Sequence, residues 1–127
     1  MSRFLWICAG GAFGTGARYL LSSWALSALP SPFPYGTLAV NLIGSFAMGL
    51  LVPVGHASPL LTPTAKLALT TGVLGGFTTY SAFNEQTLRF TQDGSYGLAA
   101  ANVAGTLAGC LLAGVAGVVL GRWLFGG

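Results

Sequence analysis

Hydrophobic residues dominate three long intervals of the chain that contain no Asp, Glu, Lys or Arg, namely residues 19–65, 67–84 and 94–121. A helix needs about 20 predominantly apolar residues to cross a bilayer. The first interval has room for part of one crossing and all of a second, and the apolar residues 4–17 complete the first. The pattern therefore predicts four membrane-spanning helices, at about residues 4–26, 35–52, 64–87 and 96–124.

Prolines mark the joints between the predicted helices. All six fall in two clusters, which are Pro30, Pro32 and Pro34 and then Pro53, Pro59 and Pro63. Proline removes a helical N–H donor, and its ring clashes with the preceding turn. We therefore expect both clusters to lie in loops, one after the first helix and one after the second.

Composition indicates an all-α integral membrane protein surrounded by membrane lipid. The chain is 54% hydrophobic and only 6% charged, whereas soluble domains carry about 25% charged residues. The net charge of +3 is small and dispersed, which does not favour binding to nucleic acid. Cys8 and Cys110 fall within predicted helices and form no Cys-x-x-Cys pair, so core packing is favoured over a disulfide or a metal site.

The basic residues divide almost evenly between the two sides of the predicted membrane domain. With four crossings, Arg3, Lys66 and Arg122 belong to one side, and Arg18 and Arg89 lie towards the other. The distribution of Lys and Arg sets the orientation of a membrane protein, and three against two is hardly a bias. The chain could therefore insert in both orientations, which would permit an antiparallel homodimer.

The third predicted helix contains the most unusual segment of the chain, residues 75–83. It combines two helix-weakening glycines with four hydroxyl side chains and with two aromatic residues three apart, Tyr80 and Phe83. Free backbone groups and polar side chains at membrane depth are tolerated only where they are buried in protein or line a wet path. We therefore expect this segment to handle an ion.

Polar side chains also recur every four residues in the second and fourth predicted helices. The two stripes are Thr37, Asn41 and Ser45, and Asn102, Thr106 and Cys110. This spacing places each set on one helix face. Asn41 alone is equally consistent with an interhelical hydrogen bond and with a functional role. Two such stripes in one small protein favour a polar path over two unrelated packing contacts.

Two further features each allow two interpretations. Tyr80 and Phe83 share a helix face and could pack in a core, but their hydroxyl neighbours favour rings whose positive edges meet an anion. Arg18 ends an uncharged run. It could snorkel from a helix end or raise the local anion concentration at the mouth of an anion path.

Glycine pairs at the spacing small-xxx-small occur in three of the four predicted helices. They are Gly10 and Gly14, Gly72 and Gly76, Gly105 and Gly109, and Gly117 and Gly121. This spacing lets helix backbones approach closely in lipid. We expect most of these pairs to serve packing.

Three motifs together carry a resemblance to a known family. They are Gly10-Gly11-x-x-Gly14 with Arg18-Tyr19, then Gly36-Thr37-Leu38-x-x-Asn41-x-x-Gly44, and Gly72-x-x-Gly75-Gly76-x-Thr78-Thr79-Tyr80-Ser81-x-Phe83. The third motif, in a chain of this size with four predicted helices, is the most specific. Along nearly its whole length the chain resembles the Fluc (CrcB) fluoride channels.

The resemblance implies an antiparallel, dual-topology homodimer in the bacterial inner membrane that exports fluoride and lowers its toxicity. It implies a third helix broken near Gly75–Thr79 and a structural Na⁺ at the dimer centre, held by main-chain oxygens of Gly75 and Thr78. The implied ion pathway contains an aromatic pair, an asparagine and a polar track. With the residues already singled out, the expected pathway is Arg18, Asn41, Tyr80, Ser81, Phe83, Thr106 and Cys110.

The chain departs from the family pattern at four positions. Tyr80 replaces a phenylalanine, Ala82 a threonine, Gln86 a glutamate and Cys110 a serine. The fold and the Na⁺ site need only backbone groups and small residues, so the differences bear on the anion route. A phenol, for example, adds a donor and an acceptor where the family has a bare ring.

Two other functional classes compete with a channel. A small four-helix, dual-topology multidrug exporter is the alternative, but it would need a carboxylate within the first helix, and residues 1–84 contain none. An enzyme would need a nucleophile with a base, or a metal cluster. One histidine, His56, which we expect in a proline-flanked loop, supplies neither.

Overall fold

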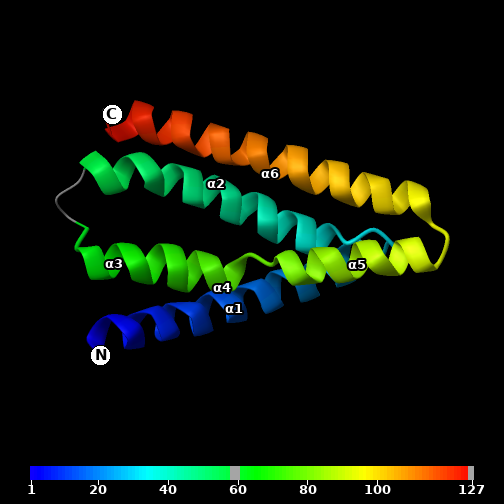
Figure 1. Ribbon diagram of the computed structural model, residues 1–127, viewed down its shortest axis with the longest axis horizontal. Coiled ribbons are helices and arrows are strands. Elements are labelled where there is room, and N and C mark those ends of the chain that lie inside the picture. The colour runs from blue at the N-terminus through cyan, green and yellow to red at the C-terminus, as the bar shows by residue number, and fades with distance from the viewer. Residues whose placement is uncertain (58–60, 126–127) are drawn as a thin grey trace.

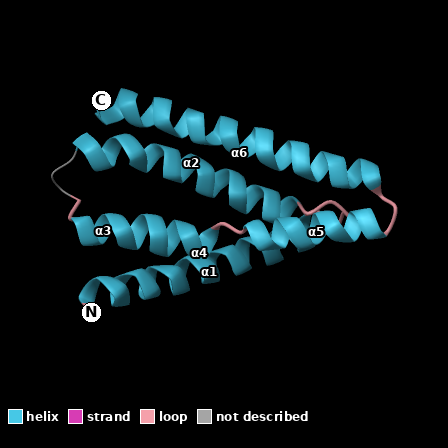
Figure 2. Cartoon of the chain, viewed as in Figure 1, coloured by secondary structure: helices cyan, strands magenta, loops and turns pink. Residues whose placement is uncertain are grey.

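The computed structural model describes residues 1–57 and 61–125, and this part of the chain is helical and contains no strand (Figure 2). The elements are α1 (Ser2–Ala28), α2 (Tyr35–Ala57), α3 (Pro63–Leu67), the π-helix η1 (Ala68–Leu74), α4 (Gly75–Phe77), α5 (Tyr80–Gln92) and α6 (Tyr96–Phe125). The predicted all-α class is confirmed. α3, η1, α4 and α5 together make one interrupted rod, so the chain forms four rods.

The rods lie side by side along the long axis of the molecule, and both termini lie at the same end (Figure 1). α2 packs along α6, whereas α1 packs along η1 and α4. α5 continues beyond the interruption and contacts α6. The interruption between α4 and α5 lies near the middle of the molecule (Figure 1).

One proline cluster lies where it was expected and the other only in part. Residues 29–34 connect α1 to α2 as a loop, but Pro53 lies inside α2 and Pro63 is the first residue of α3. The expectation of a loop at these two positions is wrong, and it is also wrong for His56, which lies in the last turn of α2. Proline suits the first turn of a helix, where its missing N–H has no partner, and the Thr62 hydroxyl caps α3 by accepting from Ala65 N–H at 3.2 Å. Pro59 lies outside the described residues.

Pro53 is accommodated because it faces a glycine on α6. It is buried, and a Cβ added at Gly121 would lie 3.0 Å from the Pro53 ring. Helices of membrane proteins tolerate proline where neighbouring elements support the backbone. The ring thus fills the space that a side chain at position 121 would occupy.

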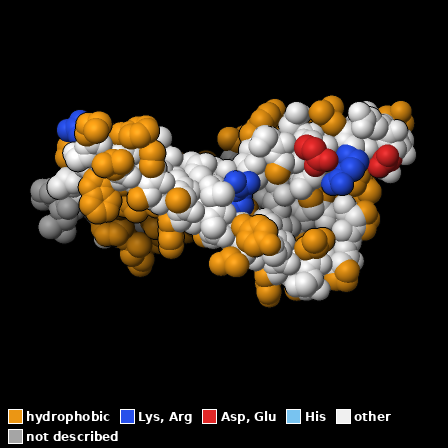
Figure 3. Space-filling model, turned by 90° about the horizontal axis from the view of Figure 1, so that it is seen from below, with side chains coloured by type: hydrophobic (Ala, Val, Ile, Leu, Met, Phe, Trp, Pro, Cys, Tyr) orange, Lys and Arg blue, Asp and Glu red, His pale blue; other side chains and the backbone are white. Residues whose placement is uncertain are grey.

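The polarity of the molecule is inverted relative to a soluble protein. The buried side chains include Asn41, Asn102 and Thr106, whereas large apolar residues such as Leu111 are exposed, in that case by 72%. Hydrophobic side chains cover much of the face seen in Figure 3, and acidic side chains gather at one end of it. Residues 35–54 and α6 are long and apolar enough to cross a membrane. α1 has the length but not the hydropathy, and the third rod is divided.

Glycine lets the helices of each pair approach to backbone contact. A Cβ added at Gly14 would collide with the carbonyl oxygen of Val73, and one at Gly117 with that of Phe46. Gly105, which was expected to pack with Gly109, has nothing within 4 Å of such a Cβ. Gly49 was not among the predicted pairs, yet it meets the backbone of Gly114. Close packing is therefore confirmed for three of the four predicted pairs.

Candidate functional site

The third rod breaks at two threonines. α4 ends at Phe77, Thr78 and Thr79 adopt extended backbone conformations, and α5 begins at Tyr80. The two glycines of this segment, Gly75 and Gly76, remain helical, so the break lies just after them, at Thr78 and Thr79. The Thr79 hydroxyl caps α5 by accepting from Ala82 N–H at 3.2 Å, which is the usual role of threonine at a helix start.

The break releases main-chain carbonyls. In a continuous α-helix Thr79 N–H would donate to the carbonyl of Gly75, and Ala82 N–H to that of Thr78. Here Thr79 N–H donates to Asn41 Oδ1 at 2.8 Å and Ala82 N–H to the Thr79 hydroxyl. The carbonyls of Gly75 and Thr78 thus lose their helical donors, and both residues line the same groove.

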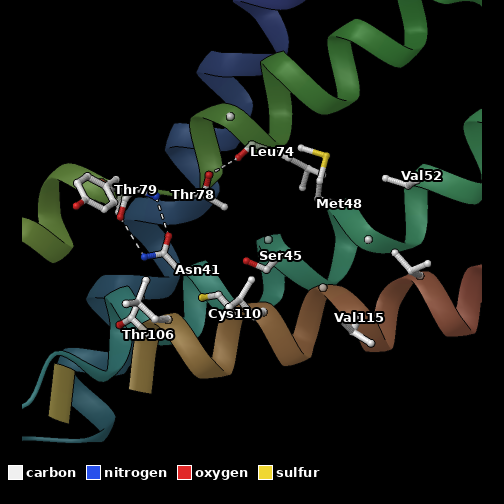
Figure 4. A pocket seen from close by; sticks show the side chains of 18 of the residues that line it. Asn41, Ser45, Met48, Val52, Leu74, Thr78, Thr79, Thr106, Cys110 and Val115 are labelled. Atoms are coloured by element: carbon white, nitrogen blue, oxygen red, sulfur yellow. Dashed lines mark hydrogen bonds between the residues drawn. The ribbon is translucent and has the colours of Figure 1, made fainter. Parts of the chain in front are cut away.

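Asn41 holds the break from the side of α2. Its Nδ2 donates to the carbonyl of Thr79 at 3.0 Å, and its Oδ1 accepts from the N–H of the same residue. The amide therefore completes a reciprocal pair with one backbone unit, as Figure 4 shows. The second N–H of Asn41 Nδ2 remains available to another acceptor. Asn41 can therefore make the interhelical hydrogen bond and still offer a donor to an anion.

Arg18 lies on the opposite side of the break, at its α1 face. Its Nε donates to the carbonyl of Gly76 at 3.2 Å, and the Thr15 hydroxyl donates to the same oxygen at 3.4 Å. The side chain is half-buried and does not line the groove. The structure thus places Arg18 against the break rather than at either end of the molecule.

A groove of about 870 Å³ runs along α2 and α6 past the break. Five of the seven predicted pathway residues line it, namely Asn41, Tyr80, Phe83, Thr106 and Cys110. Figure 4 shows Asn41, Ser45 and Cys110 pointing into one space between α2 and α6, beside the break. The groove is polar at this point and becomes apolar along α6 until it reaches Arg122. The two sequence stripes thus meet at the break.

The aromatic pair lies at the polar end of the groove. The ring centroids of Tyr80 and Phe83 are 5.5 Å apart, and their planes are tilted by 57°. Phe83 is buried, with 6% exposure, whereas Tyr80 is 75% exposed. Tilted rings present edges as well as faces, so the pair offers weakly positive ring edges beside the amide of Asn41.

Ser81 lies apart from the other predicted pathway residues. It lines a smaller hollow of about 370 Å³ along α5. That hollow also contains Glu85 and Arg89, whose exposed side chains approach to 3.8 Å. The Ser81 hydroxyl lies 3.3 Å from that of Thr79, so it touches the break but not the groove.

Two polar contacts between α5 and its neighbouring helices were not predicted from the sequence. Asn102, only 1% exposed, donates to the Thr87 hydroxyl at 2.9 Å and to the Phe83 carbonyl at 3.5 Å. Gln86 Nε2 donates to the Thr37 hydroxyl at 2.8 Å, while its buried Oε1 has no hydrogen-bond partner within the described residues. The i+4 stripes contained Asn102 and Thr37, but their spacing could not reveal which partner on α5 each would meet.

The chemistry of the site excludes a side-chain metal cluster in the described part of the chain. There, no three His, Cys, Asp or Glu residues lie close enough to hold a metal ion. The free oxygens are main-chain carbonyls and hydroxyls, which suit a hard cation. The groove lining offers amide and hydroxyl donors and ring edges to an anion.

Comparison with known proteins identifies the family of the chain. Residues 5–118 match the family described as CrcB-like protein, Camphor Resistance (CrcB). The chain belongs to this family. It is 52% identical to the "Fluoride-specific ion channel FluC" of Sorangium cellulosum, with all of both chains aligned. It is 48% identical to the protein of the same name from Anaeromyxobacter sp., over 99% of this chain and 100% of that relative.

Membership of this family decides between a channel, an exporter and an enzyme. The relatives are named as ion channels, which is not an enzymatic activity, and the chain is a membrane protein. The alternative of a small multidrug exporter is not supported, because the relatives that align with this chain over their full length are named fluoride-specific ion channels. The resemblance that the motifs indicated is confirmed.

Proposed function

We propose that the chain is a fluoride-specific ion channel that spans the bacterial inner membrane four times and releases fluoride from the cytoplasm. The observation that carries the proposal is the groove. It joins Asn41, Thr106 and the Tyr80–Phe83 pair in a chain whose full-length relatives are named fluoride channels. Fluoride enters a cell as HF, dissociates, and is then trapped as the anion. A passive path for the anion lowers its cytoplasmic concentration.

The groove lining explains how a strongly hydrated anion could pass. The remaining N–H of Asn41, the Thr106 hydroxyl and the ring edges of Tyr80 and Phe83 each replace part of the hydration shell of fluoride. Among the described residues, the one basic residue in the groove lining is Arg122, which lies 16 residues after Thr106 on α6 and so more than four helical turns away from these four residues. Conduction requires binding that is weak enough for release, and neutral donors meet that requirement better than a full positive charge.

A second copy of the chain completes the proposed channel in an antiparallel orientation. The groove is open along one face and becomes apolar along α6. Exposed apolar residues on α6, such as Leu111 and Val115, are suited to lipid or to a partner helix. An antiparallel copy would place its own break opposite the first, so that the polar parts of the two grooves lie together and the apolar parts pack.

The residues at the break fit a structural Na⁺. Gly75 and Thr78 have lost their helical donors and line the groove, and two antiparallel copies would contribute four carbonyl oxygens. A hard cation is bound well by such oxygens without a carboxylate. Na⁺ would thus link the two breaks and neutralise carbonyl dipoles that would otherwise face one another.

Anion release from liposomes tests the function directly. Purified protein is reconstituted with internal potassium fluoride or chloride, and release is followed with an ion-selective electrode. Fluoride release that exceeds chloride release by several orders of magnitude is the expected result. Equal release of both anions, or release of neither, would rule out a fluoride-specific channel.

The Na⁺ site is tested separately. Exchange of sodium for a large organic cation throughout purification should lower both fluoride release and the stability of the dimer, and added sodium should restore them. If exhaustive exchange changed neither quantity, the break would serve only to let helices cross closely.

A further inference from the structure

The carbonyls released by the break do not all have the same surroundings. Gly75 and Thr78 face the groove, whereas the carbonyl of Gly76 accepts hydrogen bonds from Arg18 and Thr15 on α1. In a continuous helix the N–H of Tyr80 would bind Gly76, but α5 begins at that residue. A side chain of α1 therefore takes the place of a helical donor.

Close backbone packing of α1 against α4 brings Arg18 within hydrogen-bonding distance of the Gly76 carbonyl. α1 packs along η1 and α4 (Figure 1), and a Cβ added at Gly76 would lie 2.5 Å from the carbonyl oxygen of Gly11. Gly11 lies about two turns before Arg18 on α1. The glycine contact thus sets the position of α4, and the Arg18 guanidinium donates to the carbonyl of Gly76, the residue that makes this contact.

We propose that Arg18 is a positioning residue for the Na⁺ site. By binding the Gly76 carbonyl it fixes the backbone on the α1 side of the break, and it thereby holds in place the backbone of Gly75 and Thr78, which line the groove. The proposal rests on the proposed Na⁺ site. A hydrogen bond from a charged donor in a low-dielectric interior is strong. It restricts rotation of the peptide unit at Gly76, which lies between Gly75 and Thr78.

This role differs from both interpretations that the sequence allowed. A snorkelling arginine would extend to a membrane surface, and an arginine at the mouth of an anion path would act through its charge alone. A positioning role depends on the N–H donor. The substitutions Arg18→Met and Arg18→Gln separate these roles, because both side chains are neutral and similar in length. Only glutamine retains an N–H donor, at the position along the side chain where arginine has Nε.

The contact itself can be observed by NMR without any measurement of transport. Gly76 and Phe77 form the only Gly–Phe peptide bond in the sequence. Labelling with carbonyl-¹³C glycine and ¹⁵N phenylalanine therefore gives a single amide–carbonyl correlation that reports the Gly76 carbonyl. We expect this resonance to move in Arg18→Met and to stay near its original position in Arg18→Gln. An unchanged resonance in Arg18→Met would overturn the proposal.

The functional consequence is read from the sodium dependence of fluoride release. The sodium concentration for half-maximal release should rise about tenfold in Arg18→Met, as expected when a charge-assisted hydrogen bond is lost. It should change by less than about threefold in Arg18→Gln. Arg3→Met is the matched control, since Arg3 is exposed near the start of the same helix. The sodium concentration for half-maximal release (the sodium half-point) should not change in this variant.

The remaining outcomes are distinguishable. If release falls equally in both Arg18 variants while their sodium half-points stay unchanged, Arg18 acts through its charge and the proposal is wrong. If Arg18→Met does not fold, Arg18→Gln still decides, because a Gly76 resonance and half-point near the original values support a donor role and a large change in either contradicts it. If the unmodified protein shows no sodium dependence, the Na⁺ site fails and the proposal fails with it.

Discussion

Asn41 shows how one side chain can combine a structural and a functional role. Both of its amide heteroatoms bind the backbone of Thr79, although its position in a polar stripe also predicted a donor that lines the path. The stripe correctly indicated that Asn41 faces inward. It could not show that the partner is a peptide unit 38 residues away, because that contact exists only once the third rod has broken.

The first prediction concerns this clamp. Asn41→Leu keeps the volume of the side chain but leaves the N–H and carbonyl of Thr79 without partners, which costs about 1–3 kcal/mol for each buried group. We expect a clear fall in the thermal unfolding midpoint of the purified protein and a loss of fluoride release. Asn84→Leu is the control, since Asn84 is exposed on α5, and its midpoint should change little. Equal midpoints in the two variants would show that the clamp does not stabilise the break.

The second prediction concerns the aromatic pair. Phe83→Ile keeps bulk and hydrophobicity but removes the ring quadrupole, so the fold and dimer should survive while fluoride release falls by about tenfold or more, equivalent to at least about 1.4 kcal/mol of lost stabilisation. Tyr80→Phe keeps the ring edges, and it should retain selectivity with a modest change in rate. Release rates and unfolding midpoints are measured together.

The opposite result for the aromatic pair would identify other donors. If Phe83→Ile conducts normally and unfolds at the same temperature, ring edges do not carry the anion. Asn41 and the hydroxyls at Thr106 and Ser81 must then do so. Because Ser81 lies outside the groove, Ser81→Ala would in that case tell whether the path leaves the groove near the break.

At the scale of elements, the sequence predicted the parts that depend on local pattern. Long apolar runs gave the four rods, the cluster from Pro30 to Pro34 gave a loop, and the glycine-threonine segment gave the break. The π-helix η1 packs against α1, and it was not predicted, because π-helices are rare and the apolar pattern of residues 68–74 is equally typical of an α-helix. The loop predicted at Pro53 was wrong because a glycine on α6, Gly121, makes room for the proline ring within α2. That contact between two helices cannot be read from the sequence around Pro53.

The third prediction tests the close packing of α1 on the third rod. In Gly14→Ala the new methyl group would collide with the carbonyl of Val73, and overpacking of this kind costs about 1–3 kcal/mol or more. Gly16→Ala is the matched control in the same helix, because its methyl group would meet nothing within 4 Å, and alanine favours a helix over glycine by about 1 kcal/mol. The unfolding midpoint should fall in the first variant and stay equal or rise in the second. A fall of similar size in both variants would show that the substitutions destabilise α1 itself and not its contact with the third rod.

At the scale of the whole molecule, the structure changes the count of charges that set orientation. Both termini lie at one end (Figure 1), and Arg3, Lys66 and Arg122 belong to that end. Arg18 binds the Gly76 carbonyl at the break, so it does not contribute to either end. Arg89 remains for the opposite end, beside Glu85. Three against one is a larger bias than the sequence indicated, because the difference rises from one charge to two, but two charges are still a small difference.

The fourth prediction tests whether so small a difference leaves both orientations populated. A cysteine tag at the C-terminus, in a chain whose Cys8 and Cys110 are replaced by serine, should react with a membrane-impermeant reagent from both faces of the membrane. Labelling from one face only would exclude a dual-topology dimer. Basic residues near the ends of membrane helices set orientation, so added lysines should force one orientation at a time.

Two oppositely biased variants make this test decisive. One has two lysines inserted after Met1, and the other has Ser27→Lys and Leu29→Lys at the exposed end of α1. Each variant alone should insert in one orientation and release no fluoride, because every antiparallel pair needs both orientations. Expressed together, the two should pair and restore release. Full activity of either variant alone, with its tag labelled from one face only, would show that parallel copies or single chains conduct, and the antiparallel dimer would have to be abandoned.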